Sequence, residues 1–164
     1  MEKLEHAQFI IERFDHYYEQ VNNKGQFYLG LSSLMVGIVI SNVEKISKIA
    51  AESYSFQAIL IIFSLTSALS IILVLTAITP FLLSGKKSNY NTLIFFNEIA
   101  KLERQKFITE FNNQTEDDMA NDYANQIHVL AQGLKLKYRH LYITSCFILI
   151  QSITIILITF KIFC

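Results

Sequence analysis

The polar side chains with the most potential for chemistry lie inside stretches of sequence that are otherwise apolar. Gln26, Gly30, Ser33, Gly37 and Ser41 follow one another at steps of four, three, four and four residues. This spacing places them on one face of a helix. Small residues let membrane helices pack closely, but a small polar face can also line water. The periodicity leaves both alternatives open, packing between helices or a surface that faces a pore.

A second group of polar residues lies near the C-terminus. Ser145 and Ser152 are seven residues apart, and Gln151 is beside them. A glutamine amide in a hydrocarbon environment needs a hydrogen-bond partner, because an unpaired polar group there costs several kcal/mol. We therefore expect Gln151 to pack against another polar helix face or to face a pore. The apolar stretch in the middle of the chain adds three serines, Ser64, Ser67 and Ser70.

Patterns typical of catalysis or metal binding are absent from the sequence. The four histidines, His6, His16, His128 and His140, are scattered, and neither a glycine-rich phosphate loop nor a Cys/His metal spacing accompanies them. The apolar stretches contain no Asp, Glu, Lys or Arg, the residues that most often carry function inside a membrane. We expect a protein that is not an enzyme and needs neither a cofactor nor a metal.

The composition explains where these polar residues lie. The chain has 164 residues, of which 52% are hydrophobic and 17% charged, whereas soluble domains carry about 25% charged residues. The formal net charge is zero, which gives no electrostatic footprint for nucleic acid. These values exclude a disordered protein, an ordinary soluble enzyme and a nucleic-acid-binding protein. They indicate a small integral membrane protein whose first partner is the lipid bilayer.

Three uncharged stretches are long enough to cross a membrane. They cover residues 25–43, 53–85 and 141–160, and a spanning helix needs about 17 to 25 apolar residues. The second stretch is longer than that, so we predict a tilted helix over residues 56–79 with Pro80 and Gly85 as stop signals. The sequence thus predicts three transmembrane helices, with the first two forming a hairpin over residues 25–85.

The distribution of positive charge predicts the orientation. Residues 1–24 and 86–140 together carry eleven Lys and Arg residues, including Lys86 and Lys87 after the second span, and the opposite side carries three. Positive residues concentrate on the cytoplasmic side of membrane proteins. We therefore expect a cytoplasmic N-terminus, a C-terminus outside, and a third span over residues 141–163.

The segments outside the predicted spans have the apolar periodicity of helices. A helix from about Lys3 to Ser41 would be about 60 Å long at about 1.5 Å per residue. Ser88 could cap a second helix that reaches Phe111, and Thr115 could cap a third that continues into the last span. We expect residues 1–24 and 86–140 to form a cytosolic helical bundle. Its apolar faces exceed what one small bundle can bury, so we expect a homo-oligomer.

The order of these elements resembles a known family. The features that carry the resemblance are Asn22-Asn23-Lys24-Gly25 at the end of the first amphipathic helix, Pro80 after the second span, Asn89-Tyr90, the run from Leu93 to Ile99, Gln126-Ile127 and Lys137-Tyr138. Over residues 10–145 the chain is similar to the transmembrane effectors of Pycsar anti-phage defence, and to related membrane effectors of cyclic-oligonucleotide defence. It departs from the family's usual pattern at Asn22, where Asp is common, and at Asn97, where Gly is common.

The resemblance implies a function and a partner. A cyclase activated by infection makes a cyclic nucleotide, either a cyclic pyrimidine mononucleotide or a cyclic oligonucleotide. The effector binds this signal and disrupts the bacterial inner membrane, so that growth stops or the cell dies before the phage matures. Such a ligand needs a cation for its phosphate and a flat side chain for its base. The candidate ligand-binding residues are Lys24, Phe95, Phe96, Arg104, Gln126, Lys137 and Tyr138.

Other interpretations of the same residues remain open. Lys137 could anchor the chain at a lipid surface, Phe95 and Phe96 could be core residues, and Gln126 could join two helices. The chain as a whole could be a structural or scaffold subunit of a membrane complex that does not signal.

Overall fold

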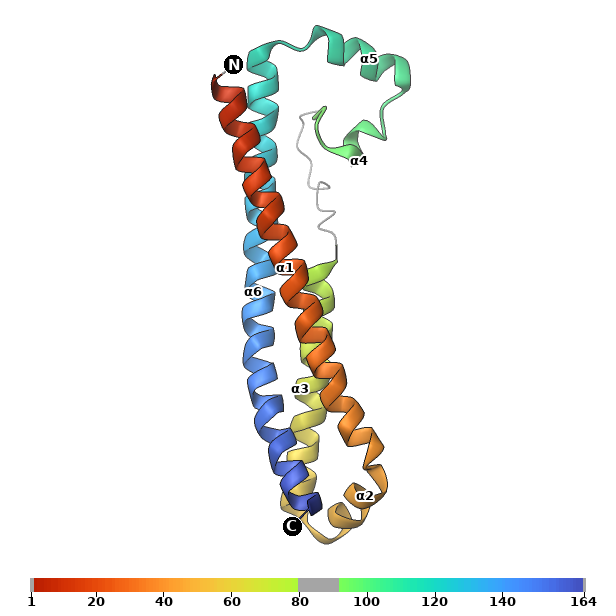
Figure 1. Cartoon of the computed structure of the whole chain (residues 1–164). Coiled ribbons are helices and arrows are strands. Elements are labelled where there is room, and N and C mark those ends of the chain that lie inside the picture. Colours follow the sequence, from red (N-terminus) through yellow and green to blue (C-terminus); the bar gives the residue numbers. More distant parts are fainter. Residues whose placement is uncertain (1, 80–91, 164) are drawn as a thin grey trace. The chain divides into compact units, whose positions relative to one another are not determined.

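The computed structural model describes residues 2–79 and 92–163, and within these ranges the chain is helical with no strand. Figure 1 shows the helices in the order in which they follow along the chain. They are α1 (Glu2–Ser41), α2 (Val43–Glu52), α3 (Tyr54–Ile78), α4 (Phe96–Ile99), α5 (Arg104–Asn113) and α6 (Glu116–Phe163). Several predicted features lie outside the described residues: Pro80, Gly85, Lys86, Lys87, Ser88, Asn89 and Tyr90.

The first helix confirms the prediction of one continuous element from about Lys3 to Ser41. α1 has 40 residues without a break, and Gly25, Gly30 and Gly37 all lie inside it, because an isolated glycine costs only about 1 kcal/mol relative to alanine. The chain then bends by 72° at Asn42 and continues as α2. The segment between the first two predicted spans therefore contains an amphipathic helix, which buries Ile46.

Two helices are apolar and long enough to cross a membrane, α3 with 25 residues and α6 with 48. α3 begins two residues before the predicted span, where the Ser53 side chain accepts a hydrogen bond from the backbone N–H of Phe56. The bent pair of α1 and α2 would be a third span if both are counted together. The described residues thus contain two or three candidate membrane-spanning helices.

The prediction for the start and course of α6 is confirmed. The Thr115 hydroxyl accepts a hydrogen bond from the N–H of Asp118, whose carboxylate accepts one from the N–H of Thr115, at 3.1 Å. This reciprocal cap satisfies backbone donors that a helix start leaves without partners. The Thr115 hydroxyl also donates to the Asp118 carboxylate. This bond, followed by the one from the Thr115 N–H, holds the pKa of Asp118 below its ordinary value. From Glu116 the helix continues unbroken to Phe163.

The single helix expected from Ser88 to Phe111 is wrong. The structure has a four-residue helix, α4, then a turn over residues 100–103, and then α5. The turn is closed by backbone bonds from Lys101 to Glu98 and from Leu102 to Ile99. Its sequence, Ala-Lys-Leu-Glu, contains no helix breaker, so local propensity does not cause the interruption. Gln114 follows the end of α5.

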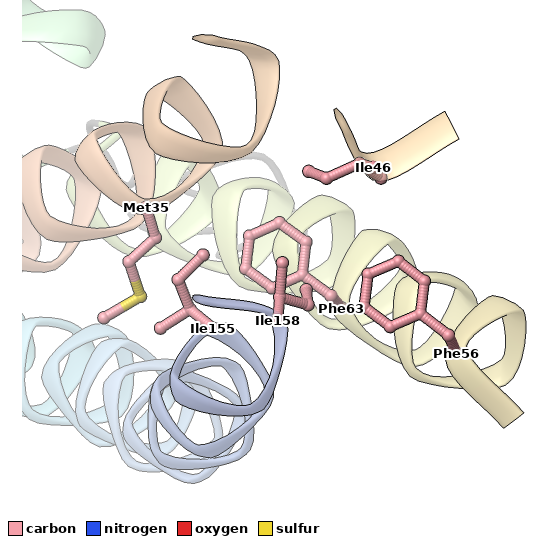
Figure 2. Close-up of a cluster of buried hydrophobic side chains, with 6 residues drawn as sticks. All are labelled: Met35, Ile46, Phe56, Phe63, Ile155 and Ile158. Atoms are coloured by element: carbon pink, nitrogen blue, oxygen red, sulfur yellow. The ribbon is translucent and has the colours of Figure 1, made fainter. Parts of the chain in front are cut away.

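The chain divides into two compact units, described separately below. Among the described residues, unit 1 contains 2–19 and 92–135, and unit 2 contains 20–79 and 136–163. The core of unit 2 is an apolar cluster of buried side chains on α1, α2, α3 and α6, in which Ile155 and Ile158 of α6 point toward Met35 and Phe63 (Figure 2). We call this set the apolar cluster: Met35, Ile46, Phe56, Phe63, Ile155 and Ile158.

Candidate functional site

A hydrogen-bonded polar cluster is buried in the apolar helices of unit 2. Its members are Ser32 on α1, Ser67 and Ser70 on α3, and Gln151 on α6, which is 0% exposed. The Gln151 amide nitrogen donates to Ser67 Oγ at 2.8 Å and lies 3.1 Å from Ser32 Oγ. Ser32 Oγ is also 3.2 Å from Ser70 Oγ. The polar cluster therefore links three helices that are distant in the sequence, and satisfies the Gln151 amide that we expected to need a partner.

Helix periodicity explains why these residues meet. Apart from Thr154, the buried side chains of α6 in unit 2 alternate at steps of four and three. From Phe63 to Ala77 those of α3 do the same, apart from Thr66. Such a repeat of about 3.5 residues keeps one seam facing the neighbouring helices. Within unit 2, the buried positions of α6 are Lys137, Leu141, Thr144, Ile148, Gln151, Thr154, Ile155 and Ile158.

Sequence reasoning identified part of the polar cluster and missed Ser32. The polar face that the spacing selected on α1 contains Ser33 instead, which is exposed. The signal for Ser32 was the other repeat on α1, in which Val21, Gly25, Tyr28 and Ser32 alternate at steps of four and three residues. Because that repeat contains few polar residues, its spacing does not mark it as a polar helix face.

The remaining predicted span residues do not join the polar cluster. Gly30 and Gly37 are exposed, and a Cβ atom added at either would meet nothing within 4 Å. Ser145 and Ser152 are half-buried and donate to carbonyl oxygens of their own helix, those of Tyr142 and Ile148. Within one chain, Gly30 and Gly37 therefore do not pack closely against another helix.

A second polar contact of unit 2 lies where α3 ends. The ammonium of Lys137 donates to the backbone carbonyls of Ala77 and Thr79, the latter at 2.7 Å. Lys137 is 5% exposed, and this burial lowers its pKa from the ordinary value. A cation at a helix C-terminus satisfies carbonyls that lack partners and interacts favourably with the helix dipole. One turn along α6, His140 Nδ1 lies 3.2 Å from the Thr76 hydroxyl.

The seven candidate ligand-binding residues are divided between the two units. Lys24, Lys137 and Tyr138 belong to unit 2, and Phe95, Phe96, Arg104 and Gln126 belong to unit 1. The rings of Phe95 and Phe96 contact each other with centroids 5.0 Å apart, and Phe96 is exposed. Lys24 and Arg104 are exposed as well. The role of all seven in ligand binding stays a prediction.

In unit 1 a buried carboxylate fixes the segment that leads into α4. Asp122 Oδ2 accepts a hydrogen bond from the backbone N–H of Leu93 at 2.8 Å. Asp122 is 1% exposed, and within the described residues its other oxygen has no hydrogen-bond partner. Nearby on α1, the Tyr18 hydroxyl donates to the carbonyl of Leu130 at 2.9 Å. Burial, followed by the charge of Asp15, raises the pKa of Tyr18.

A groove of about 330 Å³ lies between the first turns of α1 and α6 in unit 1. Its volume is at the lower end of the range of ligand pockets, about 300–1,000 Å³. Its walls contain one lysine, Lys3, and one carboxylate, Asp117. The acidic residues of these turns outnumber that single cation, so the local charge disfavours a phosphate. The acidic residues are Glu2, Glu5, Glu116, Asp117 and Asp118. In the described part of the chain, this region included, no group of three or more His, Cys, Asp or Glu could hold a metal ion.

Apolar helices of spanning length, joined by buried polar contacts, define a helical membrane protein. The chain belongs to the Pycsar effector family, because the family model described as the Pycsar effector protein domain matches residues 6–163. The resemblance found in the sequence is thereby confirmed, and the protein is a transmembrane effector of anti-phage defence. Membership implies a cyclic nucleotide signal made by a partner cyclase. Comparison with curated proteins and with solved structures gave no match.

Proposed function

We propose that the protein responds to a cyclic nucleotide by disrupting the integrity of the bacterial inner membrane, which causes growth arrest or cell death. The match to the Pycsar effector family over nearly the whole chain carries this proposal. In this proposal the protein is a homo-oligomer, catalyses no reaction, and acts by changing the conformation of its helices. It crosses the membrane three times with the N-terminus in the cytoplasm.

Two structural observations support an effector that opens the membrane. The polar cluster places a glutamine amide and three hydroxyls among apolar helices, where polar groups often serve a function. The exposed face of α1 that contains Gly30, Ser33 and Gly37 has the composition through which membrane helices associate. The first observation supports passage of water or ions, and the second supports self-association.

Membrane potential in living cells tests the proposal. The chain is expressed with and without its cyclase, and the cyclic nucleotide is supplied by active cyclase or withheld with a catalytically dead one. We expect depolarisation only when chain, cyclase and cyclic nucleotide are all present. Protein that reaches the membrane but never depolarises it would contradict the proposed function.

A scaffold subunit is the second candidate. α5 and its surroundings expose large apolar side chains that a partner protein could cover, namely Phe96, Ile108 and Phe111. Recovery of a stoichiometric partner from membranes, together with no cyclic nucleotide binding by calorimetry, would favour this function over the first.

A further inference from the structure

Unit 2 has an uneven distribution of buried polar residues along its length. From Lys137 to Gln151, the buried positions of α6 alternate between polar and apolar side chains. Lys137 and Gln151, at the two ends of this section, bond to α3, and Thr144 between them bonds to its own helix. Beyond Gln151, Ile155 and Ile158 enter the apolar cluster, where Phe63 and Met35 meet them (Figure 2). Gln151 and Ile158 are about 10 Å apart along the helix axis at about 1.5 Å per residue. A polar section is thus followed by a short apolar one.

The same order is found on the helices that pack against α6. On α1, Ser32 precedes Met35. α3 is followed from its C-terminal end, and there Ser70 and Ser67 come before Phe63 and Phe56. The contacts of Ser32 and Ser67 with Gln151 fix this register. Each helix therefore contributes first to the polar cluster and then to the apolar cluster.

Buried hydroxyls beyond the polar cluster do not extend the polar section. Thr154 Oγ1 donates to the carbonyls of Ile150 and Gln151, and Thr66 Oγ1 donates to those of Ile62 and Phe63. Each of these hydroxyls is bonded to its own helix. Ser67 and Ser70 also donate to carbonyls of α3. Unlike the two threonines, however, the serine oxygens and the Gln151 amide bond between helices as well, and they can exchange these bonds for water when the helices separate.

We propose that the bundle within a single chain is the permeation path of the effector. The polar cluster is the site where water and ions pass, and the apolar cluster is the gate that closes the path. A constriction lined only by apolar side chains excludes water and thereby stops ions. The inference rests on the proposed function, but it places the path inside each chain and not between copies. Opening requires the side chains of the apolar cluster to separate.

Two adjacent isoleucines give a matched test of the gate. Ile155 belongs to the apolar cluster and is 8% exposed, and Ile156 is 64% exposed. Purified full-length wild type, Ile155→Asn and Ile156→Asn are reconstituted into liposomes with no cyclic nucleotide, and ion leak is measured. A polar side chain in a hydrophobic constriction admits water, so we expect Ile155→Asn to raise the leak at least about tenfold over wild type. Ile156→Asn should leak like wild type.

Two adjacent serines test whether the path lies within or between chains. Ser32→Cys and Ser33→Cys are each made in Ile155→Asn protein that also carries Cys146→Ser and Cys164→Ser. If the path lies inside the chain, a charged, water-soluble thiol reagent blocks the leak at Ser32→Cys, because Ser32 is buried in the polar cluster. It has no effect at the exposed Ser33→Cys.

Each other result would overturn the inference. Block at Ser33→Cys alone would place the path between copies of the chain. Equal leak in the two asparagine variants would indicate general damage to the bilayer, and silence of Ile155→Asn would show that the apolar cluster is no gate. Two controls exclude misfolding as the cause. One is a second variant of the apolar cluster, Ile158→Asn, and the other is the helix content of the variants measured by circular dichroism. The proposed function fails separately, if cyclic nucleotide does not depolarise membranes that contain wild type.

Discussion

The ammonium of Lys137 donates a hydrogen bond to the carbonyl oxygen of Thr79, at 2.7 Å, and so joins α6 to the C-terminal end of α3. It donates to Ala77 as well. The last carbonyls of a helix have no partner within the helix, so this contact provides one at the point where α3 ends. Lys137, which the sequence analysis names as a candidate ligand-binding residue, thus has a structural role in this conformation.

Replacing Lys137 by methionine should destabilise the protein. Methionine keeps much of the buried aliphatic length but leaves the carbonyls of Ala77 and Thr79 unsatisfied, which costs about 1–3 kcal/mol. Thermal unfolding in detergent measures the loss. Lys135→Met is the control, because Lys135 is exposed on the same helix. Equal stability of the two variants would show that the contact with α3 contributes nothing.

Gln151→Leu should change stability little. Interhelical hydrogen bonds in membrane proteins contribute about 0.6 kcal/mol on average, and Ser67 and Ser70 still donate to carbonyls of α3 after the change. We expect a loss below about 1 kcal/mol, because a leucine packs well in the remaining space. Gln151→Glu should cost about 2.5 kcal/mol or more, since a charge then enters the apolar interior. Unfolding of both variants in one detergent compares them, and a large loss for Gln151→Leu would contradict this account.

Gly25 allows α1 to approach α3 closely. A Cβ atom at this position would overlap the Cγ2 methyl of Ile78, whereas one at Gly37 would meet nothing. We expect Gly25→Ala to cost about 1–3 kcal/mol through overpacking, and Gly37→Ala to leave the fold of one chain intact. Unfolding in detergent measures the first effect. Similar stability of the two alanine variants would show that the contact with Ile78 relaxes freely.

Gly30 and Gly37 should instead affect self-association. Both are exposed on one face of α1, and bulky side chains there would keep the helices of two copies apart. We expect the double variant Gly30→Ile, Gly37→Ile to lower the oligomer mass measured by light scattering in detergent. Leu34→Ile, at an exposed position between them, is the control. An unchanged mass would exclude this face as the contact between copies.

Asp122 should hold the segment before α4 through one oxygen. Asp122→Asn keeps an acceptor for the N–H of Leu93, whereas Asp122→Ala removes it. Because an amide is also less costly to bury than a carboxylate, we expect Asp122→Asn to be as stable as wild type. Hydrogen exchange of residues 92–99 should increase in Asp122→Ala alone. Faster exchange in both variants would show that the negative charge itself is needed.

Acid should loosen the start of α6. The cap with Thr115 lowers the pKa of Asp118 in the folded chain, so its stabilising contribution is complete above the ordinary pKa of about 3.9. The contribution disappears as the pH falls through the lower, folded pKa. Exchange of the amides of residues 115–119, corrected for intrinsic rates, should therefore be steady from neutral pH to about 5 and rise below about 4. Asp118→Asn should remove this pH dependence.

The sequence alone determined the helices whose course depends on local patterns. α1 and α6 are long because their apolar periodicity is not interrupted by proline, and Thr115 with Asp118 marks the start of α6. The lengths of the uncharged stretches predict membrane-spanning helices, because the thickness of the bilayer sets that length. The order of the motifs was sufficient to indicate the family that the comparison confirmed.

Only the tertiary structure decided which polar residues meet. Ser32 and Ser33 are adjacent in sequence, but packing buries the first against Gln151 and leaves the second exposed. The same packing assigns Lys137 to the end of α3, and the break between α4 and α5 occurs where no local signal predicts one. A helical repeat defines several faces with similar composition, and the one that becomes buried depends on neighbours that are distant along the chain.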